Sequence, residues 1–278
     1  MVTTIIKTAV IAVPVIFVLK AATVHLRKKL RYTTFPDMEP KGFPLYFNFL
    51  STKFSFFRLL NDREQRLFVS RLRYIRNEKH FVGRGMDITE EMEVIISASI
   101  AQLTFGLSEF GIDNLTEIHL TPGTFYSGIV GRDVKGLTFE SGRVILSWKD
   151  FEEGYAVAND KLNLGLHELA HSLWLDYFAI KEIESEFHEW NTTALRELQS
   201  MRLGTDSHFL RNYASTNIEE FWACSVECFF EAPIEFKKNI PDLYAKMCLV
   251  LKQDMAERMV NHPGFITPSV LSTNSQLS

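Results

Sequence analysis

Two histidines four residues apart, with a glutamate directly after the first, form the clearest chemical pattern in this sequence. The segment reads His167-Glu168-Leu169-Ala170-His171. On a helix, both imidazoles project from one face, so they can bind the same metal ion while Glu168 lies beside it. This pattern predicts a zinc site with an adjacent general base. A pair of core or surface histidines is the alternative, and a third ligand would exclude it.

The third ligand is expected on a second helix, within residues 213–231. The spacing Thr216-x-x-Glu219 is typical of a capping box, so Glu219 is predicted to fold back onto the helix N-terminus. Glu220 is then free to reach outward. Catalytic zinc sites commonly take three protein ligands and leave the fourth position to water, and two histidines with a glutamate form one such set. We therefore predict Glu220 as the third ligand of one Zn²⁺ ion. A solvated carboxylate at the helix start is its alternative.

One further side chain on this helix is a candidate for the site. Glu227 follows Glu220 by seven residues and is either a second partner of the site or a solvated carboxylate. If zinc is bound, Glu168 is expected to take a proton from the attacking water and return one to the leaving amine.

The elements that must position these residues are helices and a small sheet. A helix from Asn163 to Tyr177 is predicted by leucines at helical spacing behind an Asn159-Asp160 start signal. Strands at 80–85 and 115–120, with a hairpin of 137–139 and 142–148, predict a mixed or antiparallel sheet. The other expected helices are two within 54–75, separated at Asn61-Asp62, and single helices at 90–107, within 181–208, and at 244–255. The fold class is therefore α+β and mainly helical.

Composition narrows the class of protein. The 278 residues are 46% hydrophobic and carry a net charge of −4, which permits a well-buried core. There is no basic stripe interleaved with aromatic residues, so nucleic acid is not expected as a partner. The three cysteines indicate reduced thiols rather than a disulfide framework. Cys224 and Cys228 are expected to be buried and inert, with metal binding as the alternative.

The chain divides into four predicted segments: a membrane anchor at 1–26, a basic and proline-containing linker at 27–43, the main folded domain at 44–256, and a disordered tail at 257–278. Ile5 to Val24 is almost entirely apolar and would form a helix about 30 Å long, enough to span a bilayer. The basic residues directly after it predict that the folded domain faces the cytoplasm. A cleaved signal peptide and an amphipathic surface anchor are the alternatives.

From about Pro44 to Met255 the chain resembles the Mlc titration factor A (MtfA-like) family of zinc-dependent peptidases. The segments that carry the resemblance are RNEKHFVGRGMDITEEM, LTPGTFYS, SGRVILSWKDF, NLGLHELAH and YASTNIEEFWACSVECFFEAP. The spacing from Tyr213 to Glu220 is also similar to the zinc-site region of anthrax-lethal-factor-like peptidases. The resemblance implies a zincin-like fold with a gluzincin-type site, in which Glu168 is the catalytic base and the Tyr213 phenol lies near the developing oxyanion. A packed aromatic ring is the alternative for Tyr213.

One position departs from the resemblance. Members often carry an aspartate three residues after the second motif histidine, where this chain has Trp174. Asp176 is a candidate to orient an imidazole in its place. Groups that orient a metal ligand change metal affinity by about 10- to 100-fold, so the replacement of this aspartate implies weaker or altered zinc binding.

The expected function is zinc-dependent hydrolysis of a peptide or protein substrate. Two other functions compete with it: a zinc-containing regulatory or docking protein that binds a partner or peptide in its cleft with little turnover, and a hydrolase of non-peptide amides or esters. Because Glu168 has no structural reason to stand between the histidines, the catalytic function is favoured. A regulatory protein partner is compatible with the resemblance but is not identified by these residues.

Overall fold

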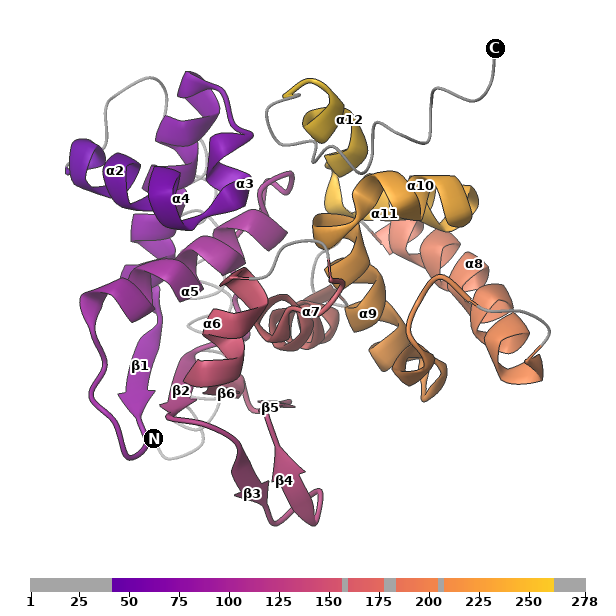
Figure 1. The fold of residues 1–278 in the computed structure, drawn as a ribbon, viewed down its shortest axis with the longest axis horizontal. Helices are drawn as coiled ribbons and strands as arrows, with labels where there is room; N and C mark the ends of the chain where they lie inside the picture. The colour runs from indigo at the N-terminus through magenta and orange to yellow at the C-terminus, as the bar shows by residue number, and fades with distance from the viewer. Residues whose placement is uncertain (1–41, 157–159, 178–183, 205–207, 263–278) are drawn as a thin grey trace, which may run out of the picture. The chain divides into compact units, whose positions relative to one another are not determined.

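The computed structural model describes residues 42–156, 160–177, 184–204 and 208–262 (Figure 1). Its helices and strands follow in this order: α2 (Phe43–Lys53), α3 (Ser55–Arg58), α4 (Asp62–Glu78), β1 (His80–Gly83), α5 (Glu90–Leu103), β2 (Glu117–Thr121), β3 (Phe125–Ser127), β4 (Arg132–Val134), β5 (Gly136–Phe139), β6 (Arg143–Ser147), α6 (Trp148–Ala156), α7 (Leu164–Tyr177), α8 (Glu184–Leu203), the 3₁₀ helix η2 (Asn212–Ser215), α9 (Ile218–Glu231), α10 (Pro233–Asn239), α11 (Pro241–Leu251) and α12 (Met255–Val260).

A four-stranded mixed sheet has the strand order β1-β2-β6-β5. Strands β1, β2 and β6 run parallel, whereas β5 is antiparallel to β6 and forms one edge. The β5–β6 turn contains Gly142 at φ 83°, a left-handed conformation that glycine adopts without a steric penalty. Residues 144–146 of β6 are buried, as their apolar run predicted. The predicted α+β class with a small mixed sheet is confirmed.

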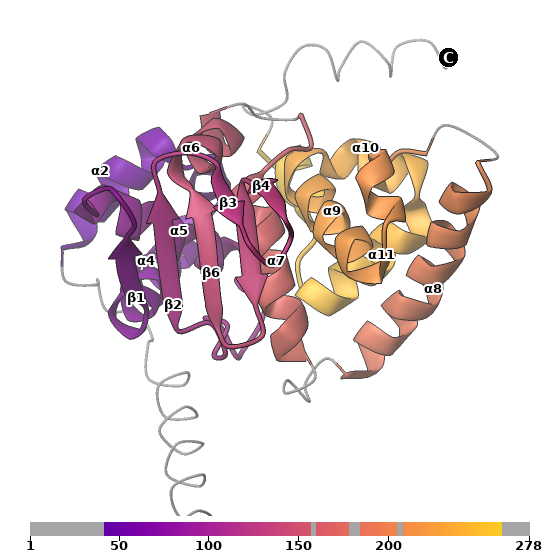
Figure 2. The ribbon, with the colours of Figure 1, turned by 90° about the horizontal axis from the view of Figure 1, so that it is seen from below.

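Helices α5 and α7 lie against the same face of this sheet (Figure 2). Helix α7 packs on β5 and β6 and also against α9, so it lies between the sheet and the C-terminal helices. Strands β3 and β4 form a separate antiparallel hairpin that directly precedes β5. This hairpin was not expected from the sequence, because three-residue strands are too short to establish an alternating pattern.

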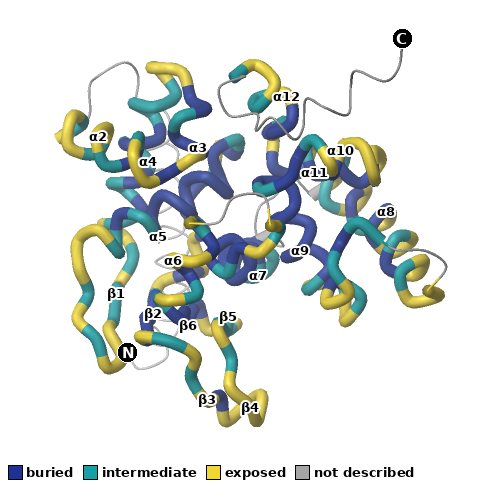
Figure 3. Tube along the Cα trace, in the orientation of Figure 1, coloured by how far each residue is buried: buried dark blue, intermediate teal, exposed yellow. Residues whose placement is uncertain are grey.

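The contact between α7 and α9 is sealed by large buried side chains. Figure 3 shows that buried positions dominate α5, α7 and α9. The indole of Trp222 on α9 donates from Nε1 to the carbonyl of Ala170 on α7 at 2.9 Å, and both residues are fully buried. Trp190 of α8 packs edge-on against Trp222, with ring centroids 4.9 Å apart. This buried hydrogen bond and aromatic packing fix the register between the two helices.

Both site helices begin differently from their sequence signals. For α7, Asn163 is the capping residue, since its Oδ1 accepts from the N–H of Leu166 at 2.9 Å. In the predicted Asn159-Asp160 start signal, Asn159 lies outside the described residues, and the helix itself begins at Leu164. For α9, Asn217 caps the helix by accepting from the N–H of Glu220, whereas Thr216 donates to the carbonyl of Tyr213. The predicted Thr216-x-x-Glu219 capping box is therefore wrong.

Three other boundaries differ from expectation. Helix α5 is capped by Thr89 and ends at Leu103, before the expected end at residue 107. The single helix expected at 244–255 is two helices, α11 and α12, separated by Lys252 at φ 50°. Helix α12 extends to Val260, into the expected tail. By contrast, the separation at Asn61-Asp62 is confirmed, because Asn61 caps α4 through a capping box with Glu64.

Within the described ranges, no helix is long and apolar enough to cross a membrane. The expected anchor at 1–26 and nearly all of the linker at 27–43 lie outside those ranges, as does the tail from residue 263.

Glu64 on α4 forms an ion pair with α12, the last helix in the described residues. Arg258 of α12 donates from Nη1 to Glu64 Oε2 at 2.9 Å and from Nη2 to Oε1 at 3.0 Å. Glu64 also accepts from the backbone N–H of Asn61 at 3.0 Å. Burial raises the pKa of Glu64, but the hydrogen bonds from Arg258 and Asn61 outweigh this effect and hold the pKa below its usual value.

Glu64→Gln is expected to lower the free energy of unfolding at neutral pH by about 1 kcal/mol, because glutamine keeps a cap acceptor but loses the paired charge. A carboxylate with a lowered folded-state pKa stabilises the protein above its unfolded-state pKa, and this contribution is lost as the pH falls through the folded-state value. The parent and variant should therefore converge in acid. Urea unfolding at neutral and acidic pH measures this, with exposed Glu152→Gln as the control. An equal difference at both pH values would exclude the charge as its cause.

Candidate metal centre

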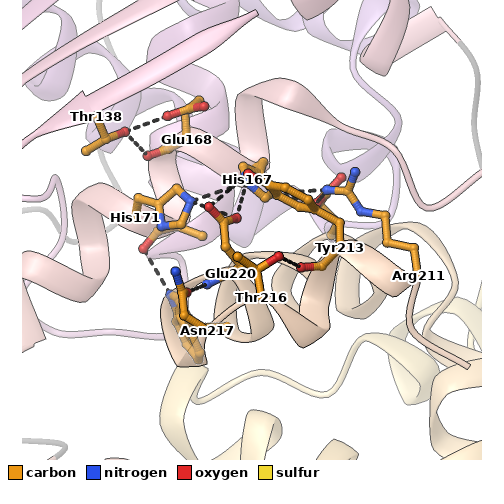
Figure 4. A network of polar contacts seen from close by, with 12 residues as sticks. Thr138, His167, Glu168, His171, Arg211, Tyr213, Thr216, Asn217 and Glu220 are labelled. Atoms are coloured by element: carbon orange, nitrogen blue, oxygen red, sulfur yellow. Dashed lines mark hydrogen bonds and ion pairs between the residues drawn. The ribbon is translucent and has the colours of Figure 1, made fainter. Parts of the chain in front are cut away.

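The structure brings the three predicted ligands together between α7 and α9 (Figure 4). Nε2 of His167 lies 3.2 Å from Nε2 of His171. Oε2 of Glu220 lies 3.0 Å from the first of these nitrogens and 3.4 Å from the second. The three ligand atoms thus form a nearly equilateral triangle.

This triangle fits a small tetrahedral cation. At zinc bond lengths of about 2.0 to 2.1 Å, tetrahedral ligand atoms lie about 3.3 to 3.4 Å from one another. Two imidazole nitrogens and a carboxylate oxygen are also a donor set that zinc accepts in catalytic sites. The residues present therefore fit a zinc ion with one coordination position left open.

Opposite charges stabilise this cluster of side chains. Burial would lower the pKa of His167, but its contacts with Cys224, Glu220 and Glu227 hold the pKa well above its usual value. Burial would raise the pKa of Glu220, whereas hydrogen bonds from the two histidines hold it well below its usual range. The positive imidazole and negative carboxylate therefore stabilise one another at the positions that a metal would join.

Glu168 points away from this triangle toward the edge strand β5. It is 6% exposed, and the hydroxyl of Thr138 lies 2.8 Å from its carboxylate Oε2 and 3.0 Å from its backbone carbonyl. Burial raises the pKa of Glu168 above its usual value. A carboxylate with a raised pKa is a better proton acceptor, which is the property that general-base catalysis requires.

Tyr213 lies on η2 at the mouth of the same site. Its hydroxyl donates to Glu220 Oε1 at 3.0 Å, and its ring centroid is 6.0 Å from that of His167. Burial, together with the neighbouring Glu220, raises the pKa of the Tyr213 phenol, so it remains a proton donor at neutral pH. With 41% of the residue exposed, the phenol lies at the cavity rather than in the core.

Glu227 supports His167 from the opposite side of the imidazole. Its Oε1 lies 2.6 Å from Nδ1 of His167, and its Oε2 accepts the backbone N–H of Asn163 at 2.9 Å. Glu227 is 1% exposed, so the structure excludes the alternative of a solvated carboxylate. The seven-residue spacing from Glu220 was the signal that identified it.

Arg211 is the site residue that the sequence pattern missed. Its Nη2 donates to Glu227 Oε1 and lies 3.1 Å from Nδ1 of His167. Its guanidinium carbon lies 5.4 Å from the centroid of the Tyr213 ring. No helical or strand spacing relates an arginine in this loop to a carboxylate 16 residues later, so only the folded chain identifies the pair. Figure 4 shows Arg211 reaching His167 from the side of Tyr213.

Trp174, which stands where family members often carry an aspartate, is part of an aromatic cluster. Trp174 packs edge-on against Phe187 and Trp190, with ring centroids 5.2 and 6.1 Å apart. Asp176 is buried, and its Oδ1 accepts the backbone N–H of Asn114 at 3.1 Å. As expected, Cys224 and Cys228 are buried.

A cavity of about 530 Å³ opens beside the cluster. One wall is the chain from Arg132 to Gly136, which joins the β3–β4 hairpin to the edge strand. The other lining residues come from α6, from the chain leading into α7, and from the site itself: Asp150, Glu153, Gly154, Asp160, Leu162, Asn163, Leu164, His167, Glu168, Arg211, Tyr213 and Glu227. Glu168 and Tyr213 therefore both face the space available to a substrate.

A helix carrying His-Glu-x-x-His, completed by a glutamate from a second helix, is the arrangement of metal-dependent hydrolases. The chain belongs to the glucose-regulated metallo-peptidase M90 family, whose sequence model matches residues 38–252. It is similar to Mlc titration factor A of Salmonella arizonae, with 23% identity over 227 residues that cover 72% of this chain and 88% of that protein. The corresponding proteins of Salmonella paratyphi B and Salmonella typhimurium are also 23% identical, with 83% of their length covered. The resemblance noted in the sequence is confirmed.

Gly136→Ala is expected to displace the Glu168 carboxylate. A Cβ atom at this position would lie 2.4 Å from Glu168 Oε1 and 2.5 Å from Cγ, far inside contact distance. The Thr138 hydrogen bond should break, and the protein should lose about 1 to 3 kcal/mol of stability. A crystal structure and thermal unfolding would measure both effects.

Gly128→Ala is the matched control, because a Cβ there meets no atom within 4 Å. It should leave the melting temperature unchanged. If Gly136→Ala also left the Glu168 carboxylate and the melting temperature unchanged, the close packing of β5 on α7 would be disproved.

Proposed function

We propose that this protein is a zinc-dependent peptidase that hydrolyses peptide bonds with Glu168 as the general base. The observation that carries the proposal is the triangle of His167, His171 and Glu220 beside a buried carboxylate and an open cavity. Membership of a metallopeptidase family supports the same class of reaction.

His167, His171 and Glu220 would hold one zinc ion. Zinc, when bound, lowers the pKa of a coordinated water and polarises the carbonyl to be attacked. Glu227 keeps His167 in place by accepting from Nδ1, which leaves Nε2 free to act as a ligand.

Glu168 would accept the proton of the attacking water and deliver it to the leaving amine. Its raised pKa favours this proton transfer, and the hydroxyl of Thr138 fixes the carboxylate. Because Glu168 lines the cavity, the proton does not have to cross bulk solvent.

Tyr213 would donate its hydroxyl hydrogen to the oxyanion that forms on the substrate. The Tyr213 hydroxyl donates to Glu220 Oε1 at 3.0 Å, and donation to the oxyanion would replace this hydrogen bond. One well-placed donor of this type stabilises a tetrahedral transition state by about 3 kcal/mol. A peptide bound along β5, an edge strand of the sheet, would pass both groups.

The organisation of the whole chain is part of the proposal. Residues 44–256 would form the peptidase domain, and 1–26 would anchor it with the domain in the cytoplasm. The apolar run Ile5 to Val24 and the basic residues after it support this arrangement.

Docking without efficient cleavage is the second candidate function. The relatives are named Mlc titration factor A, a name that refers to titration of another factor rather than to hydrolysis. In this case the cavity would bind a regulatory protein or a peptide and release it intact.

Glu168→Gln is expected to keep zinc but to lower the turnover of a peptide library by about 10²- to 10⁴-fold, since the amide cannot accept the proton. The parent and the variant are compared at equal zinc content, with cleavage followed by mass spectrometry. Equal cleavage by both proteins would remove Glu168 from the mechanism. No cleavage by either, with zinc present in both, would favour docking or a non-peptide substrate.

Glu220→Ala is expected to lose stoichiometric zinc, because only two protein ligands remain. The adjacent Glu219→Ala is the matched control, since Glu219 is exposed and is not one of the clustered ligands. Metal content after dialysis is measured by elemental analysis. Full retention of zinc by Glu220→Ala would refute the ligand assignment.

A further inference from the structure

The imidazole of His167 belongs to two groups of metal-ligating side chains. Within the described ranges, these are His167 with His171 and Glu220, called here the front group, and His167 with Cys224 and Glu227, called the rear group. In each group the ligand atoms all lie within 4.8 Å of one another. Nε2 of His167 faces the front group, and Nδ1 faces Glu227 of the rear group.

A neutral imidazole has one free nitrogen lone pair, so it can bind a metal ion for only one of these groups at a time. A neutral imidazole carries one N–H, so a metal on Nε2 leaves Nδ1–H to donate to Glu227. A metal on Nδ1 would instead leave Nε2–H to donate to Glu220. The rear group offers a cysteine sulfur, a ligand that zinc binds well, and all three of its residues are buried. Some other feature of the structure must therefore determine which of the two groups binds the metal.

Arg211 covers the rear group with a permanent positive charge. Its Nη2 bonds to Glu227 Oε1 and lies 3.1 Å from Nδ1 of His167, and the guanidinium also interacts with Cys224. A metal ion at this place would have to displace the guanidinium and would be repelled by its charge.

The hydrogen-bond geometry also orients the imidazole toward the front group. The separation of 2.6 Å between Nδ1 and Glu227 Oε1 requires a proton between two otherwise repelling lone pairs. Nδ1 therefore donates, and the nearby Nη2 of Arg211 donates to the same oxygen. A ring that gives up one proton to bind a metal therefore keeps the proton on Nδ1, and its lone pair on Nε2 faces the front group.

We propose that Arg211 is a positioning residue that closes the rear group to metal ions and so directs the metal to His167, His171 and Glu220. This inference rests on the proposed zinc function of the front group. Because Arg211 lines the cavity, shortening its side chain would open the rear group to ions from that side.

The test is the absorption spectrum of the full chain loaded with one equivalent of Co²⁺, which reports whether a thiolate binds the metal. The parent should lack a thiolate-to-cobalt charge-transfer band. Arg211→Ala should gain this band, and adding Cys224→Ser to that variant should abolish it. Arg211→Lys, which keeps a cation, should resemble the parent.

Two controls separate this role from a purely structural one. Arg202→Ala removes an arginine that donates to the backbone carbonyls of Ser215 and Thr216 without belonging to either group, and should show no band. Arg211→Gln, whose side chain is neutral and of similar length, replaces Arg211→Ala in the experiment if Arg211→Ala does not fold. The other buried thiol on α9, Cys228, has a pKa raised to about 12 by burial, which disfavours its thiolate.

The outcomes distinguish this inference from the proposed function. If the folded neutral variants kept the parent spectrum, Arg211 would not exclude the metal, and only this inference would fail. If the parent itself showed a band that Cys224→Ser removed, the metal would already occupy the rear group, and the proposed ligand set would fail too. A band confined to the neutral Arg211 variants and dependent on Cys224 supports both.

Discussion

The register between α7 and α9 is the constraint on which the site depends. The hydrogen bond from Trp222 to the carbonyl of Ala170 fixes that register in the core. It places two glutamates of α9, two helical turns apart, on opposite sides of one imidazole of α7. A shift of a single residue would rotate both carboxylates off the facing surface. The ligand triangle and its support are thus consequences of one helix–helix contact.

Burying so many ionisable groups is possible because each charge has a partner. The carboxylate of Glu227 would be costly at 1% exposure, but an imidazole, a guanidinium and a backbone N–H share its two oxygens. Glu168 has one hydroxyl partner and its pKa is raised instead. The site therefore contains one carboxylate with partners on both oxygens and another whose pKa is raised by burial, because their surroundings differ.

Much of the fold could be predicted from the sequence because helices and strands have regular periods. The helix caps were harder to predict, because several neighbouring residues are suited to the capping position. The histidine helix, the β5–β6 hairpin and the buried β6 strand follow from spacing alone. The cap of α9 was predicted at the wrong residue because Thr216 and Asn217 are both good capping residues. The residue that caps the helix is the one whose backbone is extended directly before it, and this is Asn217. The short β3–β4 hairpin has too few residues to carry a period.

The sequence by itself determined the chemistry that is possible: two imidazoles and a carboxylate on one helical face, with candidates for a third ligand and a phenol on another segment. The period of the helix dictates this, whatever the rest of the chain does. Tertiary structure alone decided that Glu220 meets the histidines, that Gly136 makes room for Glu168, and that Arg211 closes the rear side of His167. Those contacts join residues 16 to 53 positions apart, and only packing specifies distances over such separations.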